Sequence, residues 1–196
     1  MLGVRAGDNV SFELLLQRYR SPLVNFLFRM VRDRATAEDL AQDVFLRVYR
    51  ARKQYTPSAK FTTWLFRIAT NVALNSVRDN RHQKMQVSLD GPVSAEEDSV
   101  ARDLPARESR IDQQLLERDR VEFIQRAIAS LPEKQRAAVL LHKYEEMDYA
   151  EIAETLDCTE AALKSLLFRA YENLRVQLAP LITQPATQRA GEGRPS

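Results

Sequence analysis

The chain has 196 residues, of which 29% are charged and 44% hydrophobic, with a formal net charge of +2 and only 5 glycines. This length suits two small domains, and the single cysteine, Cys158, excludes both an internal disulfide bond and a zinc site built from several cysteines. The net charge is too small to diagnose nucleic-acid binding, and because no signal peptide and no membrane-spanning apolar run are apparent, we expect a soluble, cytoplasmic protein.

Apolar residues at three- and four-residue spacing predict helices from Ser11 to about Arg81. The first series stops at the segment 33–36, where Thr36 is placed to cap a second helix that runs to about Lys53. Valine-rich alternating runs are absent, so we predict no sheet and an all-α fold.

The second helix combines an apolar inner face with a mixed outer face. Its inward positions are apolar: Leu40, Val44, Phe45 and Val48. Its outward positions are Asp39, Gln42, Asp43, Leu46, Arg47 and Arg50. One exposed leucine within a polar rim suits a protein-binding surface, although a solvated face with incidental salt bridges fits the pattern at least as well.

A third helix, from Thr62 to about Arg81, follows a loop that contains Pro57. Its buried stripe is expected to consist of Leu65, Ile68, Ala69 and Val72, with Leu74 or Val77. Polar residues recur on the opposite face: Thr63, Arg67, Asn71, Asn75 and Arg78. Asparagine can hydrogen-bond base edges and arginine can neutralise phosphates, so this face predicts either contact with nucleic acid or an ordinary solvated surface.

Helical periodicity fades between Gln83 and about Ile111, where acidic residues, glycine and proline predict an unstructured linker. Beyond it a second domain starts near Asp112. The chain is therefore divided into a domain at 1–81, a linker at 82–111, a domain at 112–182 and a disordered tail at 183–196.

Within the second domain, Pro132 opens a helix, either with Leu131 as its cap or with a capping box of Ser130 and Glu133. The stretch from 149 to 169 then predicts a helix-turn-helix. Its parts are an inner face of Ile152, Ala153 and Leu156, a turn at Asp157 and Cys158, a cap at Thr159, and a second helix with Leu163, Leu166 and Leu167 inward. The outer face of that second helix carries Glu160, Ala161, Lys164, Ser165 and Arg169. Because spacing, turn and cap agree, DNA binding is favoured over a plain helical hairpin.

No other segment predicts chemistry. His82 and His142 lie in unrelated segments, so we expect no metal site, and His142 is interpreted as structural. The acidic pair Glu145–Glu146 is expected to be solvated, and Cys158 to be a small packed residue rather than a redox switch. Neither a phosphate-binding glycine loop nor a Ser/His/Asp arrangement can be assembled, so we predict a protein that is not an enzyme and has no cofactor.

Three segments together resemble one family, the extracytoplasmic-function (ECF) group of bacterial sigma factors. AEDLAQDVFLR at 37–47 resembles the helix that binds core RNA polymerase, and FTTWLFRIATN at 61–71 resembles the promoter-melting helix. LPEKQR at 131–136, followed by EIA at 151–153 and LKS at 163–165, resembles the domain that reads the −35 element. The resemblance spans about 11–178 in the family's order and spacing.

The resemblance implies a role for each segment. The residues implied to bind the β' coiled-coil of core polymerase are Asp39, Gln42, Asp43, Leu46 and Arg47. Those implied to contact the −10 element are Tyr55, Lys60, Phe61, Thr63, Trp64, Arg67, Asn71, Asn75 and Arg78, with the 55–61 loop holding a flipped base. Those implied to face the −35 duplex are Thr159, Ala161, Ala162, Lys164, Ser165 and Arg169. The chain departs from the family at Leu166 and Tyr171, where arginine is common.

We therefore predict an ECF-type sigma factor that binds core polymerase through the β' coiled-coil and the β flap, recognises promoter DNA at both elements and promotes melting. An anti-sigma factor is an expected partner, and no insertion into a membrane is expected. Two alternatives are a helix-turn-helix repressor or activator, which would dimerise on a palindrome without polymerase, and a helical adaptor that binds only proteins.

Overall fold

The computed structural model describes residues 1–87 and 108–183, and the regular structure within these two ranges is helical throughout. The first range holds α1 (Leu2–Arg5), α2 (Asn9–Val31), α3 (Arg34–Arg50), the 3-10 helix η1 (Ala51–Lys53) and α4 (Phe61–Val87). The second holds α5 (Glu108–Ala129), α6 (Glu133–Lys143), α7 (Tyr149–Thr155) and α8 (Glu160–Thr183). The predicted all-α class is confirmed.

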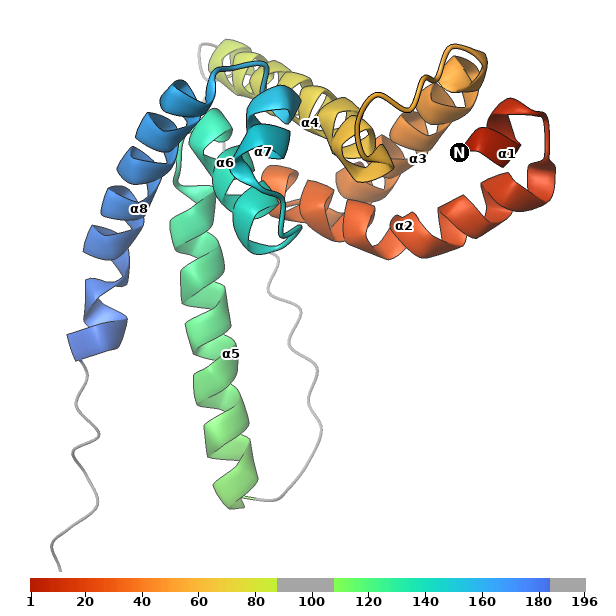
Figure 1. Ribbon diagram of the computed structural model, residues 1–196. Coiled ribbons are helices and arrows are strands. Elements are labelled where there is room, and N and C mark those ends of the chain that lie inside the picture. Colours follow the sequence, from red (N-terminus) through yellow and green to blue (C-terminus); the bar gives the residue numbers. More distant parts are fainter. Residues whose placement is uncertain (88–107, 184–196) are drawn as a thin grey trace, which may run out of the picture.

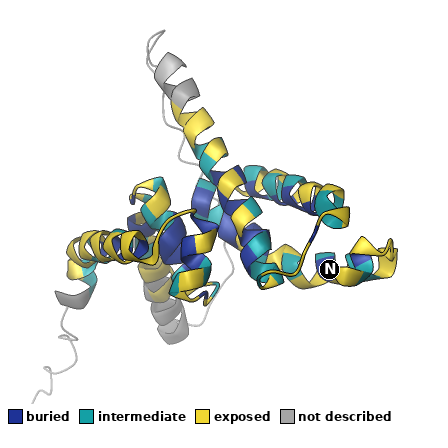
Figure 2. Cartoon of the chain, turned by 45° about the horizontal axis from the view of Figure 1, so that its top comes forward, coloured by how far each residue is buried: buried dark blue, intermediate teal, exposed yellow. Residues whose placement is uncertain are grey.

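The helices form two groups that meet along α4 (Figure 1). In the N-terminal group α2 packs on α3 and α4, and in the C-terminal group α6 packs on α8, which also contacts α5 and α7. Helices α6 and α7 then pack on α4, so the two groups share one apolar core. Its fully buried members come from both groups and include Phe26, Leu27, Leu65, Leu141 and Ile152. Figure 2 shows buried residues gathered where the groups meet and exposed residues towards the outer ends of the helices.

The start of α3 differs from the prediction. The helix begins at Arg34, and its cap is Asp33, whose carboxylate accepts a hydrogen bond of 2.7 Å from the Thr36 amide. Thr36 is thus the third residue of the helix rather than its cap. Both residue types cap helices well, but Asp33 has the extended backbone of a cap (φ −129°).

The start of α6 also differs from both predicted arrangements. Pro132 itself is the cap, α6 begins at Glu133, and no side chain caps it. The Ser130 hydroxyl is engaged elsewhere, because it donates to the Ala127 carbonyl and lies 2.8 Å from the Gln177 side-chain oxygen. A capping box at Ser130 and Glu133 therefore does not form.

The edges of the predicted linker are helical. Helix α4 continues past Gln83 to Val87, and α5 begins at Glu108, before the expected start near Asp112. The rest of the linker prediction, at 88–107, and the predicted tail from 184 onward lie outside the described residues.

Candidate nucleic-acid and protein-binding surfaces

Helices α7 and α8 form the predicted helix-turn-helix, and local hydrogen bonds fix its geometry. Asp148 and Glu151 make a capping box at the start of α7, with bonds of 2.8 Å and 3.0 Å. Asp157 adopts the predicted left-handed turn conformation, with φ 51°. The Thr159 hydroxyl accepts a 3.2 Å hydrogen bond from the Ala162 amide and so caps α8, as predicted.

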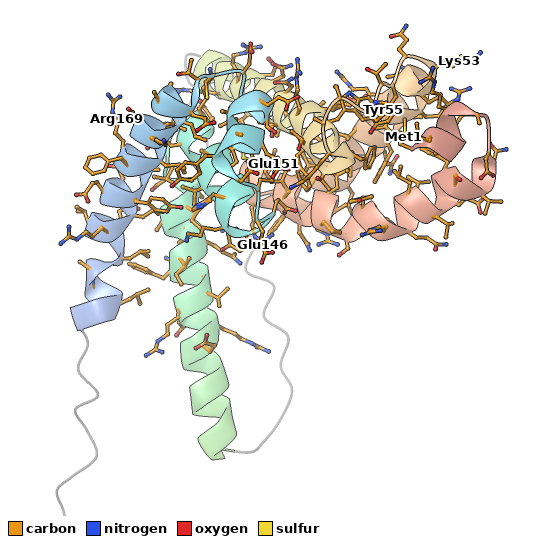
Figure 3. All side chains as sticks on the ribbon, in the orientation of Figure 1. Met1, Lys53, Tyr55, Glu146, Glu151 and Arg169 are labelled. Carbon is orange, nitrogen blue, oxygen red and sulfur yellow. The ribbon has the colours of Figure 1, made fainter. Side chains whose placement is uncertain are left out.

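The outward face of α8 is open. Leu163 and Leu167 are buried, and Leu166 is half-buried. The predicted outward residues are all exposed: Glu160, Ala161, Lys164, Ser165 and Arg169, with Ala162 beside them. Figure 3 shows Arg169 on the outer side of α8, away from the N-terminal helices.

The outer face of α8 also carries Phe168, which the sequence analysis did not predict there. Its side chain is 68% exposed, one helical turn beyond Lys164 and on the same face. The helical spacing could have predicted this position, because an apolar residue outside the buried stripe of Leu163 and Leu167 points outward.

Tyr171, where arginine is common in the family, serves the packing of the C-terminal domain. Its hydroxyl lies 2.7 Å from Nδ1 of His142, whose ring also packs edge-on against Tyr149. Burial lowers the pKa of His142 and raises that of Tyr171. The structural interpretation of His142 fits these contacts, and Tyr171 adds no cation to the outer face of α8.

The polar face of α4 is exposed over most of its length. Arg67, Asn71, Asn75 and Arg78 are all exposed, and Arg78 donates a 2.9 Å hydrogen bond to the side-chain oxygen of Asn75. Two basic and two amide side chains thus follow one another along a single face, which suits contacts to phosphates and to base edges.

Thr63 does not belong to this exposed face, in contrast to the prediction. It is 1% exposed, and its hydroxyl donates a 3.3 Å hydrogen bond to Oε1 of Glu151. Lys60 pairs with the same carboxylate, Nζ to Oε1 at 2.9 Å. The hydrogen bond and the charge of Glu151 raise the pKa of Lys60. The sequence pattern of α4 alone could not reveal a partner that comes from α7, 88 residues further along the chain.

The aromatic residues of the 55–61 loop and of the first turn of α4 pack on one another. Tyr55 is 7% exposed, with its ring 5.0 Å from Trp64 and 6.3 Å from Phe61. Phe61 also packs against Tyr19 of α2, at 5.3 Å. Tyr55 and Lys53 lie at the far side of the molecule from Arg169 (Figure 3). The Tyr55 ring therefore anchors the loop in this structure and does not project from it.

Helices α2 and α3 enclose a groove of about 1230 Å³. Phe12 and Leu16 of α2 and Phe45 of α3 give it an apolar lining, and Gln42 and Leu46 stand on its α3 side. Leu46 is 53% exposed.

The remaining predicted polymerase-binding residues, Asp39, Asp43 and Arg47, lie four residues apart on the stripe of α3 next to Gln42 and Leu46, outside the lining of the groove. Asp39 and Arg47 are exposed, and Arg47 forms an ion pair with Asp43 at 2.9 Å. An apolar groove with a charged rim is suited to an amphipathic helix.

Two further predictions about single residues were wrong. Cys158 is exposed instead of packed, since it lies in the turn, outside the apolar stripes of α7 and α8. Glu145 is half-buried instead of solvated, whereas its neighbour Glu146 is exposed. Burial raises the pKa of Glu145 to about 7.

Within 1–87 and 108–183, no helix is long and apolar enough to cross a membrane. The same residues contain no cluster of three or more histidine, cysteine, aspartate or glutamate side chains that could hold a metal ion.

Comparison with known proteins agrees with this geometry. The family model of sigma-70 region 2 matches residues 15–83, and that of sigma-70 region 4 matches residues 123–174. The RNA polymerase sigma-H factor of Pseudomonas aeruginosa is 32% identical over 184 residues, covering 92% of this chain and 93% of that protein. The ECF RNA polymerase sigma-E factor of Escherichia coli K12 is 30% identical over 181 residues, covering 91% and 92%. This chain belongs to the ECF group of the sigma-70 family.

The sigma factor is therefore a non-catalytic protein that initiates transcription together with RNA polymerase. Its fold is similar to that of CnrH, solved in complex with the cytosolic domain of CnrY, with a TM-score of 0.63, 19% identity and coverage of 90% and 93%. It is equally similar to RpoE of Bartonella quintana, solved with the anti-sigma factor NepR, with a TM-score of 0.63, 22% identity and coverage of 86% and 97%.

Proposed function

We propose that this sigma factor recognises a promoter through two separate surfaces and opens it with one of them. The outer face of α8 reads the −35 duplex, with Thr159, Ala161, Ala162, Lys164, Ser165 and Arg169 facing the major groove. The face of α4 holds unpaired bases of the −10 element. Capture of those bases offsets the cost of melting, since stacking and base-edge contacts are available only in the open strand.

The observation that carries this proposal is the continuous exposed face of α4, with Arg67, Asn71, Asn75 and Arg78. A solvated helix face has no need of asparagine, which forms helices poorly, whereas its amide can bond a base edge. Lys60 and the aromatic side chains Phe61 and Trp64 complete this proposed −10 surface, with the buried Tyr55 ring packed against both aromatic rings, together with Thr63 once α7 has moved away.

The surfaces that bind other proteins are assigned domain by domain in the same way. The groove between α2 and α3, lined in part by Gln42 and Leu46, is assigned to the β' coiled-coil of core polymerase, together with the adjoining stripe of α3 that carries Asp39, Asp43 and Arg47. The C-terminal domain is assigned to the β flap. An anti-sigma factor is a further partner, as in the complex solved for RpoE of Bartonella quintana. The site of action is the cytoplasm, where bacterial polymerase works.

The polymerase surface is tested by Asp43→Arg. Replacing this carboxylate removes the ion pair to Arg47 and places a second cation on the surface, so retention of the protein on immobilised core polymerase should fall at least tenfold. Asp119→Arg, the same change on exposed α5, is the matched control and should bind normally. Circular dichroism checks that both variants are folded. Equal retention of the two variants would remove α3 from the polymerase interface.

A further inference from the structure

The segment that precedes α2 folds back and docks beside the 55–61 loop. Helix α1 contacts both α2 and η1, the 3-10 helix that leads into this loop. Val4 is buried in the apolar core, and Met1 packs against the same core. Figure 3 shows Met1 and Tyr55 in one region of the molecule, on the opposite side from Arg169. Helix α1 is therefore held by apolar packing at the place where the loop begins.

Local hydrogen bonds fix α1 against the start of α2. The chain turns at Gly7, whose φ of 92° lies in the left-handed region that favours glycine. The Asp8 carboxylate then caps α2, since it accepts hydrogen bonds from the Val10 and Ser11 amides at 3.0 Å and 3.3 Å and from the Ser11 hydroxyl at 2.5 Å. The Asp8 amide donates back to the Gly3 carbonyl at 3.0 Å. The turn and the cap thus set the position of α1 independently of the 55–61 loop.

Gly3 allows α1 to lie this close to α2. A β-carbon added at Gly3 would lie 3.0 Å from the Ser11 Cβ and would overlap the Ser11 hydroxyl. That hydroxyl donates to the Asp8 carboxylate, so it could turn away only by giving up this hydrogen bond. A side chain at Gly3 would therefore push α1 away from α2 without changing any charged group of the protein.

Arg5 connects the fixed position of α1 to the loop. Its Nη1 atom donates a 3.2 Å hydrogen bond to the main-chain carbonyl of Tyr55, 50 residues further along the chain. The Tyr55 ring is held separately, because it packs against Trp64 at 5.0 Å and against Phe61 at 6.3 Å, in the first turn of α4. The first residue of the loop is thus held at its carbonyl by α1 and at its ring by α4.

The residues that follow in the loop are open to solvent. Thr56, Pro57 and Ser58 are exposed, and the Ser58 amide donates to the Thr56 carbonyl at 2.8 Å in a short turn. An exposed loop must be ordered when it binds a base, and this ordering reduces its affinity. A loop whose first residue is already held at two points loses less freedom on binding, and it presents its remaining residues in one arrangement.

We propose that Arg5 is a positioning residue for recognition of the −10 element, and that α1 is the support that holds it. Arg5 fixes the start of the 55–61 loop, so that the loop and the first turn of α4 meet an unpaired base in one preset arrangement. The proposal rests on the function assigned above to the −10 surface. Arg5 acts through the Tyr55 carbonyl and needs no contact with DNA. Because a loose loop can adapt to several bases, loss of this hydrogen bond should reduce discrimination between bases more than total affinity.

Three variants separate the position of the loop from the charge of Arg5. Arg5→Ala removes both the hydrogen bond and a cation, whereas Arg5→Lys keeps a cation and a donor at the same place. Gly3→Ala keeps every charged group and displaces α1 from α2. Arg118→Ala, which removes an exposed cation from α5, is the matched control.

The test uses the full chain on core polymerase and measures which templates it binds. The templates are a DNA library in which random duplex is followed by a short pre-melted bubble of random sequence, so that the cost of melting is removed. Sequencing of the bound templates gives the base preference at each bubble position. Titration at several salt concentrations gives the total affinity and its salt dependence. Circular dichroism checks that every variant is folded.

We expect the wild type, Arg5→Lys and Arg118→Ala to share one pattern of base preference. Arg5→Ala and Gly3→Ala should each lower the preference at one bubble position severalfold, with the preferences in the upstream duplex unchanged. The salt dependence of the total affinity should also stay unchanged, because no phosphate contact is lost. A general loss of stability could not produce this result, since it would weaken every preference together.

Two outcomes would overturn the proposal. The first is a wild-type base preference in both Arg5→Ala and Gly3→Ala. The second is weaker binding to all templates with a shallower salt dependence in Arg5→Ala alone, which would make Arg5 a phosphate contact. Failure of the underlying function would look different: if the wild type shows no base preference within the bubble, the −10 surface itself is assigned wrongly and the role of Arg5 falls with it.

Discussion

Glu145 is a residue whose protonation depends on the packing of the two domains. It lies in the loop between α6 and α7, at a cavity of about 280 Å³ between the domains. Charged groups reach this cavity from several elements: Arg18 of α2, Lys60 before α4, Glu146 of the same loop and Glu151 of α7. Burial raises the pKa of Glu145 from 4.5 to about 7, while the charge of Arg29 acts in the opposite direction.

This raised pKa predicts a pH dependence of domain packing. A carboxyl whose pKa is higher in the packed state favours that state when protonated, so its contribution is fully present below about pH 4.5 and is lost as the pH rises through about 7. Energy transfer between one dye on the exposed Cys158 and a second dye on Lys53→Cys reports the separation of the domains. It should therefore fall as the pH rises from about 5 to 8.

The matched variant is Glu145→Gln, which stays neutral and should flatten this pH profile. Circular dichroism, measured in parallel, should show that the protein stays folded across this pH range, so that the change in energy transfer does not come from unfolding. His142 titrates in the opposite sense, because its lowered pKa favours the folded domain at higher pH. A profile that is the same with and without the Glu145 carboxyl would contradict the prediction.

At the scale of elements, α4 is the helix on which we propose that melting depends. The paired substitution Asn71→Ala and Asn75→Ala removes one or two base-edge hydrogen bonds, each of about 1–3 kcal/mol, and should shift the melting equilibrium strongly towards closed DNA. Permanganate footprinting should show loss of opening on duplex promoters, while polymerase binding and most −35 affinity remain. A pre-melted bubble template should partly rescue transcription, because its opening has no further cost. Normal opening of duplex DNA by the double variant would contradict the role of α4.

Helix α8 is expected to behave as a duplex reader. Lys164→Ala and Arg169→Ala each remove an exposed cation from its outer face, so each should weaken binding to −35 duplex DNA. If the lost contact is to a phosphate, the slope of log affinity against log salt should also become shallower by about one unit. Binding isotherms at several salt concentrations measure both effects. Wild-type affinity and slope in both variants would show that another face of the C-terminal domain meets the DNA.

Features of the elements that depend on neighbours in sequence could be predicted. The turn at Asp157, the cap at Thr159 and the outward face of α8 all follow from local backbone preferences and from helical spacing, and the structure contains each of them. Alternative caps were harder to separate, because Asp33 and Thr36 are both good caps three residues apart.

Features that depend on contacts between the domains could not be predicted. Thr63 has the sequence context of an exposed polar residue, yet it is buried and its hydroxyl bonds to Glu151 of α7. Glu145 is likewise half-buried, and it lies at a cavity that residues of both domains line. Helical periodicity describes how one helix divides into two faces, and it contains no information on which distant helix covers which face.

At the scale of the whole molecule, the two proposed DNA-reading surfaces belong to different domains of one chain. The outer face of α8 is open in this structure, whereas part of the proposed −10 surface, at Lys60 and Thr63, contacts Glu151 of α7. A sigma factor that reads the duplex and then captures single strands would use these surfaces in that order. A repressor or a protein-binding adaptor, the two alternative functions, would not require one surface for duplex DNA and another for single strands.

The most direct test of this account is selection of promoters from a random DNA library by core polymerase carrying the sigma factor, with sequencing of the transcribed templates. The account predicts two separate sequence blocks at a fixed spacing. Lys164→Ala with Arg169→Ala should erode only the upstream block, and Asn71→Ala with Asn75→Ala only the downstream block. A single palindromic block, selected equally well without polymerase, would contradict it.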